Sequence, residues 1–188
     1  MTAATSAPVP PIVVGVGASA GGLEAISNLI RPLDPALPMA FVVLQHVSPN
    51  HKSMLVEILS RETRLQVVRL EHLQRPEPGV IYVVPANTNA TIKEGAFHTT
   101  PALPHIVPKP SINDFFSSLA SDAHESAVGI VLSGTGSDGT AGLRAILAAG
   151  GITMVQTPSS AKYDGMPQSA IDAGVIDYIL DVDEMAAR

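Results

Sequence analysis

The 188-residue chain contains no cysteine, so disulfides, zinc-thiolate sites and thiol catalysis are excluded, and we expect a cytoplasmic protein. Long apolar runs are also missing. None approaches the roughly 20 residues that a membrane-spanning helix needs, so we expect no membrane insertion. The first residues lack the basic and apolar segments of a secretory leader. We expect residues 1–10 to be a flexible tail or linker remnant and residues 11–188 to form one domain.

Positive charge is scarce and dispersed. The net charge is -6, and the 11 lysines and arginines are scattered along the chain. Because binding to nucleic acid depends on clustered lysine and arginine, we expect no nucleic-acid partner. Hydrophobic residues make up 46% of the chain and charged residues 15%, which is too apolar for a disordered protein. One compact domain with a sizeable core is therefore expected.

Short runs rich in valine and isoleucine alternate with segments of helical period. Seven of these runs are predicted to be strands, at 12–16, 40–44, 67–70, 80–84, 127–132, 152–155 and 175–180. An antiparallel hairpin is predicted around Lys93-Glu94-Gly95, where the alternation is interrupted. This order predicts an α/β fold with a doubly wound, mostly parallel sheet, flanked by helices and accompanied by one antiparallel hairpin.

Apolar residues recur at helical spacing in four segments between the predicted strands. Ser111, with Asp114 three residues later, predicts the start of one of these helices. The predicted buried stripes are Leu23, Ile26, Leu29 and Ile30; Met54, Leu55, Ile58 and Leu59; Ile112, Phe115, Phe116 and Leu119; and Leu143, Ile146 and Leu147.

The stretch Gly17-Ala18-Ser19-Ala20-Gly21 follows the first predicted strand and admits two interpretations. It fits the pattern G-x-S-x-G, in which a serine lies on a tight turn between a strand and a helix. Together with Gly15 it also resembles a loosened dinucleotide-binding fingerprint. Both interpretations need small residues here, so the stretch alone leaves both open.

Polar side chains also follow two other predicted strands. Gln45 and His46 come after the second, and Asp138 lies in the glycine-rich segment after the fifth. Because parallel strands end at the same edge of a sheet, Ser19, His46 and Asp138 are predicted to converge there. A serine nucleophile needs a base, and an imidazole base needs a carboxylate to orient it. Taken alone, Asp138 is expected to cap the helix that follows it.

The end of the second strand also bears on the dinucleotide interpretation. A dinucleotide-binding domain has an acidic residue there to hold the ribose, whereas this chain has Gln45 and His46. The phosphate-binding pattern G-x-x-x-x-G-K-[ST] is absent from the sequence.

The remaining histidines show no metal-ligand spacing, so we expect no metal and no cofactor. We expect surface positions for these histidines, which are His51, His72, His98, His105 and His124.

Five short segments occur in order between Ile12 and Leu180. They are Gly17-Ala18-Ser19-Ala20-Gly21-Gly22, Gln45-His46, Lys109-Pro110-Ser111-Ile112, Gly134-Thr135-Gly136-Ser137-Asp138-Gly139 and Tyr163-Asp164-Gly165-Met166-Pro167. In sequence and spacing they resemble the catalytic domain of CheB-type protein-glutamate methylesterases.

The resemblance implies a doubly wound α/β domain that hydrolyses glutamate γ-methyl esters on chemotaxis receptors or receptor-like signalling proteins. The reaction releases methanol, and deamidation of receptor glutamines is an implied second activity. By position, Ser19 matches the family's nucleophile, His46 its general base and Asp138 the carboxylate that orients the histidine. The candidates for binding the oxyanion are the backbone N–H groups of Ala20, Thr135 and Gly136.

Ala20 and Thr135 stand where many members have a hydroxyl residue and a methionine. They resemble the branch in which the esterase domain is fused to receptor methyltransferase and sensory kinase modules. Methylated cytoplasmic helices of receptors are therefore the expected substrate, and such modules are expected partners. The familiar enzymes carry an N-terminal receiver domain, whereas about ten residues precede the first predicted strand here, so we expect an excised domain or a stand-alone relative. A non-catalytic module that binds these partners is the alternative function.

Overall fold

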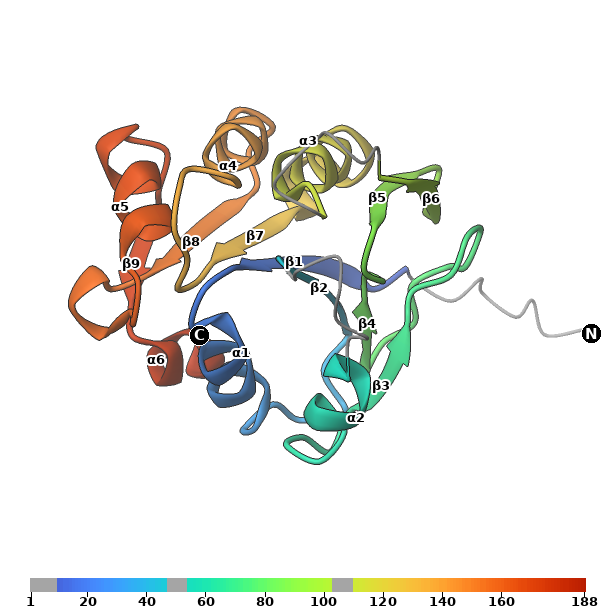
Figure 1. Cartoon of the computed structure of the whole chain (residues 1–188). Helices are drawn as coiled ribbons and strands as arrows, with labels where there is room; N and C mark the ends of the chain where they lie inside the picture. Colours follow the sequence, from blue (N-terminus) through green and yellow to red (C-terminus); the bar gives the residue numbers. More distant parts are fainter. Residues whose placement is uncertain (1–9, 47–53, 103–109) are drawn as a thin grey trace, which may run out of the picture.

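The computed structural model of the chain describes residues 10–46, 54–102 and 110–188. Its main sheet has seven strands, all parallel to their neighbours, in the order β3-β4-β2-β1-β7-β8-β9 (Figure 1). The strands are β1 (Ile12–Ala18), β2 (Met39–Gln45), β3 (Gln66–Arg69), β4 (Val80–Val83), β7 (Val128–Val131), β8 (Ile152–Gln156) and β9 (Tyr178–Leu180). All seven predicted strands are present, and the predicted parallel α/β fold is confirmed.

The last strand begins at Tyr178, later than the predicted start at Val175. Just before it, Asp177 is joined to β8 by its backbone N–H, which donates to the Thr153 carbonyl oxygen at 3.1 Å, and by its side chain. Its carboxylate accepts hydrogen bonds from the backbone N–H of Thr153 at 2.9 Å and from the Thr153 hydroxyl at 3.0 Å. These bonds join the segment to β8 before regular pairing starts, which shortens the strand.

Helices cover both faces of the sheet, as predicted (Figure 1). On one face lie α1 (Gly22–Ile30), α2 (Leu55–Leu59) and α6 (Val182–Ala187), and on the other lie α3 (Ile112–Ala123), α4 (Thr140–Ala148) and α5 (Gly165–Asp172). Two short 3-10 helices complete the set, η1 (His124–Ser126) and η2 (Pro158–Ser160). Each face has its own hydrophobic core beneath its helices. In the described ranges, no helix is both long and apolar enough to cross a membrane.

The predicted buried stripe is correct in α3, whereas in α4 Leu143 and Ile146 are buried but Leu147 is half-buried, and the stripes of α1 and α2 are too wide. Leu23 is 38% exposed, Ile58 is 37% exposed and Met54 is 61% exposed. Met54 precedes α2 as its N-cap residue, and α2 has only five residues, so it buries one narrow face through Leu55 and Leu59. Leu23 and Ile58 instead line a groove described below.

The predicted antiparallel hairpin is present as β5 (Thr88–Lys93) and β6 (Ala96–Pro101). Glu94 and Gly95 form its tight turn with φ values of 53° and 67°, as a two-residue hairpin turn requires. The hairpin packs on α3, where the Ser118 hydroxyl accepts a hydrogen bond from the Ile92 N–H at 3.0 Å.

The topology places a crevice next to the central strand. From β1 the chain first builds the β2 side of the sheet and later returns to build the β7 side. The strand order therefore reverses at β1, and in open α/β sheets ligands bind at such a point, beyond the carboxyl ends of the strands. Ser19 follows β1, and the glycine-rich segment 133–139 follows β7.

Candidate active site

Ser19 lies on a tight turn between β1 and α1, as the G-x-S-x-G pattern predicts. The turn depends on Gly21, which has a φ of +72°. A Cβ atom at this position would come within 2.8 Å of both the Lys162 Cβ and the Ser133 Oγ. A side chain at Gly21 would therefore be strained and would also clash, so the sharp turn requires glycine.

The backbone of Ser19 is held by both neighbouring strands. Its N–H donates to the Ser133 carbonyl oxygen at 3.0 Å, and its carbonyl oxygen accepts from Gln45 Nε2 at 2.7 Å. Gln45 Nε2 also donates to the His46 carbonyl oxygen at 3.0 Å. The Gln45 amide thus links the backbones of Ser19 and His46. Among the described residues, the Ser19 hydroxyl has no hydrogen-bond partner, and it lines an open groove.

His46 is placed beside Ser19 by the register of β1 and β2. Ala18 pairs with Gln45, and the His46 N–H continues the ladder by donating to the Ala18 carbonyl oxygen at 2.9 Å. Ser19 and His46 therefore follow the last paired positions of two adjacent strands, which run about 4.8 Å apart. The sequence places these residues 27 positions apart (46 minus 19), and the parallel pairing brings them together.

His46 and Asp138 are in contact through their side chains. His46 Nε2 and Asp138 Oδ2 are 2.9 Å apart, and the two side chains are 11% and 7% exposed. The predicted association of these two residues is thus present in the geometry. Because Nε2 faces the carboxylate, Nδ1 is the ring nitrogen left for proton transfer, the reverse of the arrangement in the chymotrypsin triad.

Asp138 is not the N-cap residue of α4, so the expectation that it caps the helix following it is wrong, although its Oδ1 accepts from the Gly139 N–H at 3.0 Å. The N-cap of α4 is Gly139, which provides no side-chain bond. Asp138 instead lies at the start of α3, where its carboxylate accepts from the N–H groups of Ile112 at 2.8 Å and Asn113 at 3.0 Å. The Asn113 side chain in turn accepts from the Gly139 N–H at 3.0 Å. The close packing of α3 on α4 makes this exchange of caps possible.

The surroundings of Asp138 favour its ionised form. Burial raises the pKa of the carboxyl group, but hydrogen bonds from His46 and from the backbone N–H groups of Ile112 and Asn113 outweigh burial. The pKa of Asp138 is therefore lowered from its ordinary value of 3.8. At neutral pH the carboxylate is a charged acceptor for a His46 N–H, and this fixes the tautomer of the imidazole.

The three backbone groups predicted to hold an oxyanion come from two segments, the turn that contains Ser19 and the glycine-rich segment after β7. In the part of the chain that the structure describes, the N–H groups of Ala20, Thr135 and Gly136 have no protein acceptor. The residues that precede these groups differ, since the Ser19 N–H binds the Ser133 carbonyl oxygen and the Gly134 N–H binds the Tyr163 carbonyl oxygen. Gly134 lies against Ser19, because a Cβ atom there would approach the Ser19 Cβ to 2.8 Å.

Ser133 and Gln156 support the site but were not among the predicted site residues. The buried Ser133 hydroxyl donates to the Ala20 carbonyl oxygen at 2.8 Å and accepts from the Tyr163 N–H at 3.0 Å. Gln156 accepts from the Ser133 N–H at 3.0 Å. These partners are far apart in the sequence, so no local pattern reveals them. Gln45 was noted for following a strand, but its link between Ser19 and His46 was not predicted.

Of the other histidines, the three that the structure describes take no part in this arrangement. His72 and His124 are exposed, and His98 is half-buried with its ring centroid 5.4 Å from that of His72. Their predicted place at the surface is thus confirmed for His72 and His124, whereas His51 and His105 lie outside the described residues.

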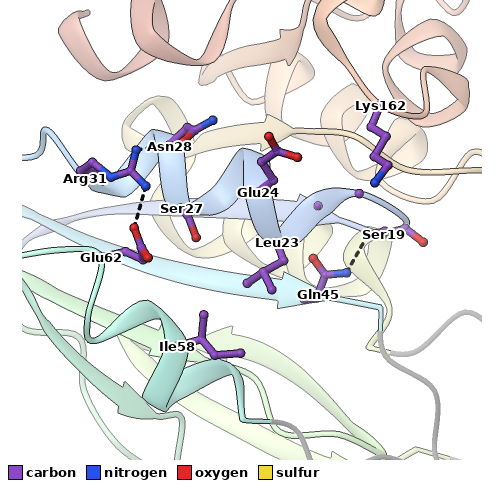
Figure 2. A pocket seen from close by; sticks show the side chains of 12 residues that line it. Ser19, Leu23, Glu24, Ser27, Asn28, Arg31, Gln45, Ile58, Glu62 and Lys162 are labelled. Carbon is purple, nitrogen blue, oxygen red and sulfur yellow. Dashed lines mark hydrogen bonds and ion pairs between the residues drawn. The ribbon is translucent and has the colours of Figure 1, made fainter.

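A groove of about 600 Å³ begins at Ser19 and runs between α1 and α2 (Figure 2). Its residues come from the Ser19 turn, from both helices, from the end of β2 and from the segment before α5: Ser19, Gly21, Gly22, Leu23, Glu24, Ser27, Asn28, Arg31, Gln45, Ile58, Glu62 and Lys162. Ser19 is thus open to a substrate, while the side chains of His46 and Asp138 are nearly buried and do not line the groove. A serine on a strand-to-helix turn beside a histidine–carboxylate pair is the arrangement of the serine hydrolases of the α/β class.

Comparison with known proteins narrows this class to one family. Residues 14–188 match the family model described as CheB methylesterase, and the chain belongs to this family. The fold agrees with the crystal structure of the Thermotoga maritima CheB methylesterase catalytic domain, with a TM-score of 0.86, 24% identity, and coverage of 95% of this chain and 97% of that one.

Similar full-length proteins carry one shared description. A protein-glutamate methylesterase/protein-glutamine glutaminase of Photorhabdus laumondii is 35% identical over 94% of this chain and 51% of its own length. A protein of the same description from Paraburkholderia xenovorans is 36% identical over 92% of this chain and 49% of its own length. The chain therefore spans about half the length of the curated relatives that it matches.

Proposed function

We propose that the chain is a serine hydrolase that removes methyl groups from glutamate γ-methyl esters on chemotaxis receptors or receptor-like signalling proteins. Deamidation of glutamine side chains is the proposed second reaction, since the same relatives are described as protein-glutamine glutaminases. The observation that carries the proposal is the contact of His46 with Asp138 next to Ser19, at the ends of adjacent strands.

In the proposed mechanism, the Ser19 hydroxyl attacks the carbonyl carbon of the ester while His46 Nδ1 accepts its proton. The negative charge of Asp138 stabilises the imidazolium that forms, through the 2.9 Å contact with Nε2. His46 then gives the proton to the leaving methoxide, which departs as methanol. A water molecule, deprotonated by the same imidazole, hydrolyses the acyl-enzyme and leaves a free glutamate carboxylate.

The tetrahedral intermediate needs donors for its oxyanion. The N–H groups of Ala20, Thr135 and Gly136 support this role, because they have no protein acceptor in the described ranges, Ala20 follows Ser19, and Thr135 and Gly136 follow Gly134, which lies against Ser19. Donation from the backbone does not depend on side-chain identity. The presence of alanine and threonine at two of these positions is therefore compatible with the proposal.

The proposed partners are the methylated cytoplasmic helices of receptors, together with receptor methyltransferase and sensory kinase modules. A receptor side chain is a substrate on a protein surface, which suits a serine at the end of an open groove. The proposal includes a cytoplasmic location, because the receptor helices that serve as substrate are cytoplasmic.

The test is methanol release from methyl-esterified cytoplasmic fragments of receptors, with wild-type protein compared with Ser19→Ala. We expect release by the wild type and a loss of at least about 10³-fold in Ser19→Ala. Circular dichroism spectra of the two proteins must match, so that the loss reports chemistry. Equal release by both proteins would exclude Ser19 as the nucleophile. No release by either, with kinase and methyltransferase modules present, would favour a non-catalytic binding module.

A further inference from the structure

The groove that begins at Ser19 has two walls made by residues one helical turn apart. Leu23 and Ser27 on α1 and Arg31 at its C-cap follow each other at four-residue spacing, and the facing residues are Ile58 on α2 and Glu62 in the segment after it. Figure 2 shows Leu23 and Ile58 between Ser19 and Glu62, with Ser27 directed between the two helices. The groove therefore follows the α1 axis away from the serine.

The far end of the groove is closed by an ion pair. Arg31 Nη2 and Glu62 Oε2 are 2.6 Å apart and link α1 to the segment after α2 (Figure 2). From Leu23 to Arg31 the helix rises by about 12 Å, at about 1.5 Å per residue. This length matches about two turns of a second helix. The groove thus has an ion pair at one end and Ser19 at the other, and Leu23 and Ile58 are the apolar side chains in a lining that is otherwise polar or glycine.

The apolar part of the groove is exposed to solvent. Leu23 is 38% exposed and Ile58 is 37% exposed, although both belong to helices that otherwise bury their apolar residues against the sheet. Ser27 between them is too small to fill the space. Exposed apolar side chains that line a groove continuous with a reactive residue are typical of a binding surface.

We infer that Leu23 and Ile58 determine substrate specificity by binding an apolar side chain of the substrate helix, located one turn from the esterified glutamate. The inference rests on the proposed function. An amphipathic helix in the groove would place its ester at Ser19 and the residue one turn away about 5 Å further along, over Leu23 and Ile58. The occupant is thus a helix whose ester has an apolar neighbour three or four residues away.

The test measures binding without turnover. The protein is Ser19→Ala, and the probes are two helical peptides of about 20 residues, each with one glutamate γ-methyl ester. One peptide has leucine four residues before and four residues after the ester, and the other has serine at both positions. We expect the leucine peptide to bind about tenfold more tightly, since its apolar side chain is buried in the groove. Isothermal titration calorimetry provides both dissociation constants.

A second pair of proteins locates the preference in the groove. The first protein carries Leu23→Ser and Ile58→Ser in addition to Ser19→Ala. It should bind both peptides with the affinity that Ser19→Ala has for the serine peptide. The matched control is Ile179→Ser in the same background, because Ile179 is 48% exposed but does not line the groove. This control should keep the tenfold preference.

Equal affinity of the two peptides for Ser19→Ala, including no binding of either, would overturn the inference. A preference retained after substitution of Leu23 and Ile58 would also overturn it. The first comparison changes only the peptide and does not depend on the folding of a variant. A leucine preference without methanol release from receptor fragments would refute the proposed function alone. Methanol release without a leucine preference would refute the specificity assignment alone.

Discussion

On the α3 side of Ser19, the side chains of His46 and Asp138 are 11% and 7% exposed, whereas on the α1–α2 side Leu23 and Ile58 are 38% and 37% exposed. The first region is connected by hydrogen bonds to the start of α3, and the second is an open groove. The difference separates two tasks. Groups that move a proton need one fixed geometry, whereas groups that contact a large substrate must remain accessible.

The largest expected effect comes from removing the base in the buried region. His46→Gln should lower the rate of methanol release by about 10³-fold or more, since it removes the imidazole that accepts the Ser19 proton in the proposed mechanism. The measurement is methanol release under single-turnover conditions. His72→Gln, a change at an exposed histidine, is the control and should release methanol at the wild-type rate. Release by His46→Gln at the rate of that control would exclude His46 as the base.

A second large effect is expected at Asp138. Asp138→Asn keeps the shape of the side chain but removes its charge, so it should lower turnover by about 10²-fold to 10⁴-fold. It should also alter how stability depends on pH. The lowered pKa of Asp138 stabilises the folded protein above the ordinary value of 3.8, and this contribution is lost as pH falls through that value toward the folded-state pKa.

Urea unfolding of wild type and Asp138→Asn from about pH 7 down to about pH 3 checks the second part of this prediction. The wild type should be the more stable protein at the upper end, and the difference in the free energy of unfolding should shrink below about pH 4. A difference that stays constant over the whole range would contradict the ionised, hydrogen-bonded state of Asp138.

A smaller effect is expected where the two regions meet, at Gln45. Gln45→Leu removes the hydrogen bonds to the carbonyl oxygens of Ser19 and His46. The position of His46 relative to Ser19 should then be less well fixed. We expect kcat to fall by about tenfold with little change in KM, and the free energy of unfolding to fall by about 1–2 kcal/mol. Gln66→Leu, at an exposed residue of β3, is the matched control. A raised KM with unchanged kcat would assign Gln45 to substrate binding instead.

The smallest effect is expected at the end of the groove. Arg31→Gln removes an ion pair whose side chains are 58% and 35% exposed, so water and salt screen the interaction. The free energy of unfolding should fall by about 0.5 kcal/mol or less, and by still less in 0.5 M salt, an ionic strength of about three times the physiological value. Urea unfolding at two salt concentrations measures this change. A loss comparable with that of Gln45→Leu would mean that the pair holds the two helices together.

Much of the fold could be predicted because its determinants are local. Valine- and isoleucine-rich runs mark the strands, and Ser111 caps α3 by accepting from the Asp114 N–H at 3.1 Å, as the sequence predicts. The widths of the α1 and α2 stripes were predicted incorrectly, because helical spacing does not reveal where a helix faces a groove. The flexible tail and the domain limits remain predictions.

The alternation of strands and helices, the turn at Ser19 and the candidate residues Ser19, His46 and Asp138 could all be predicted from the sequence. Tertiary structure decided which helix Asp138 caps, which imidazole nitrogen faces it, and that Leu23 and Ile58 open into a groove. The physical reason is the range of the interactions. Propensity and periodicity act over a few residues, whereas the partners of Asp138 are 92 residues away at His46 and 26 residues away at Ile112.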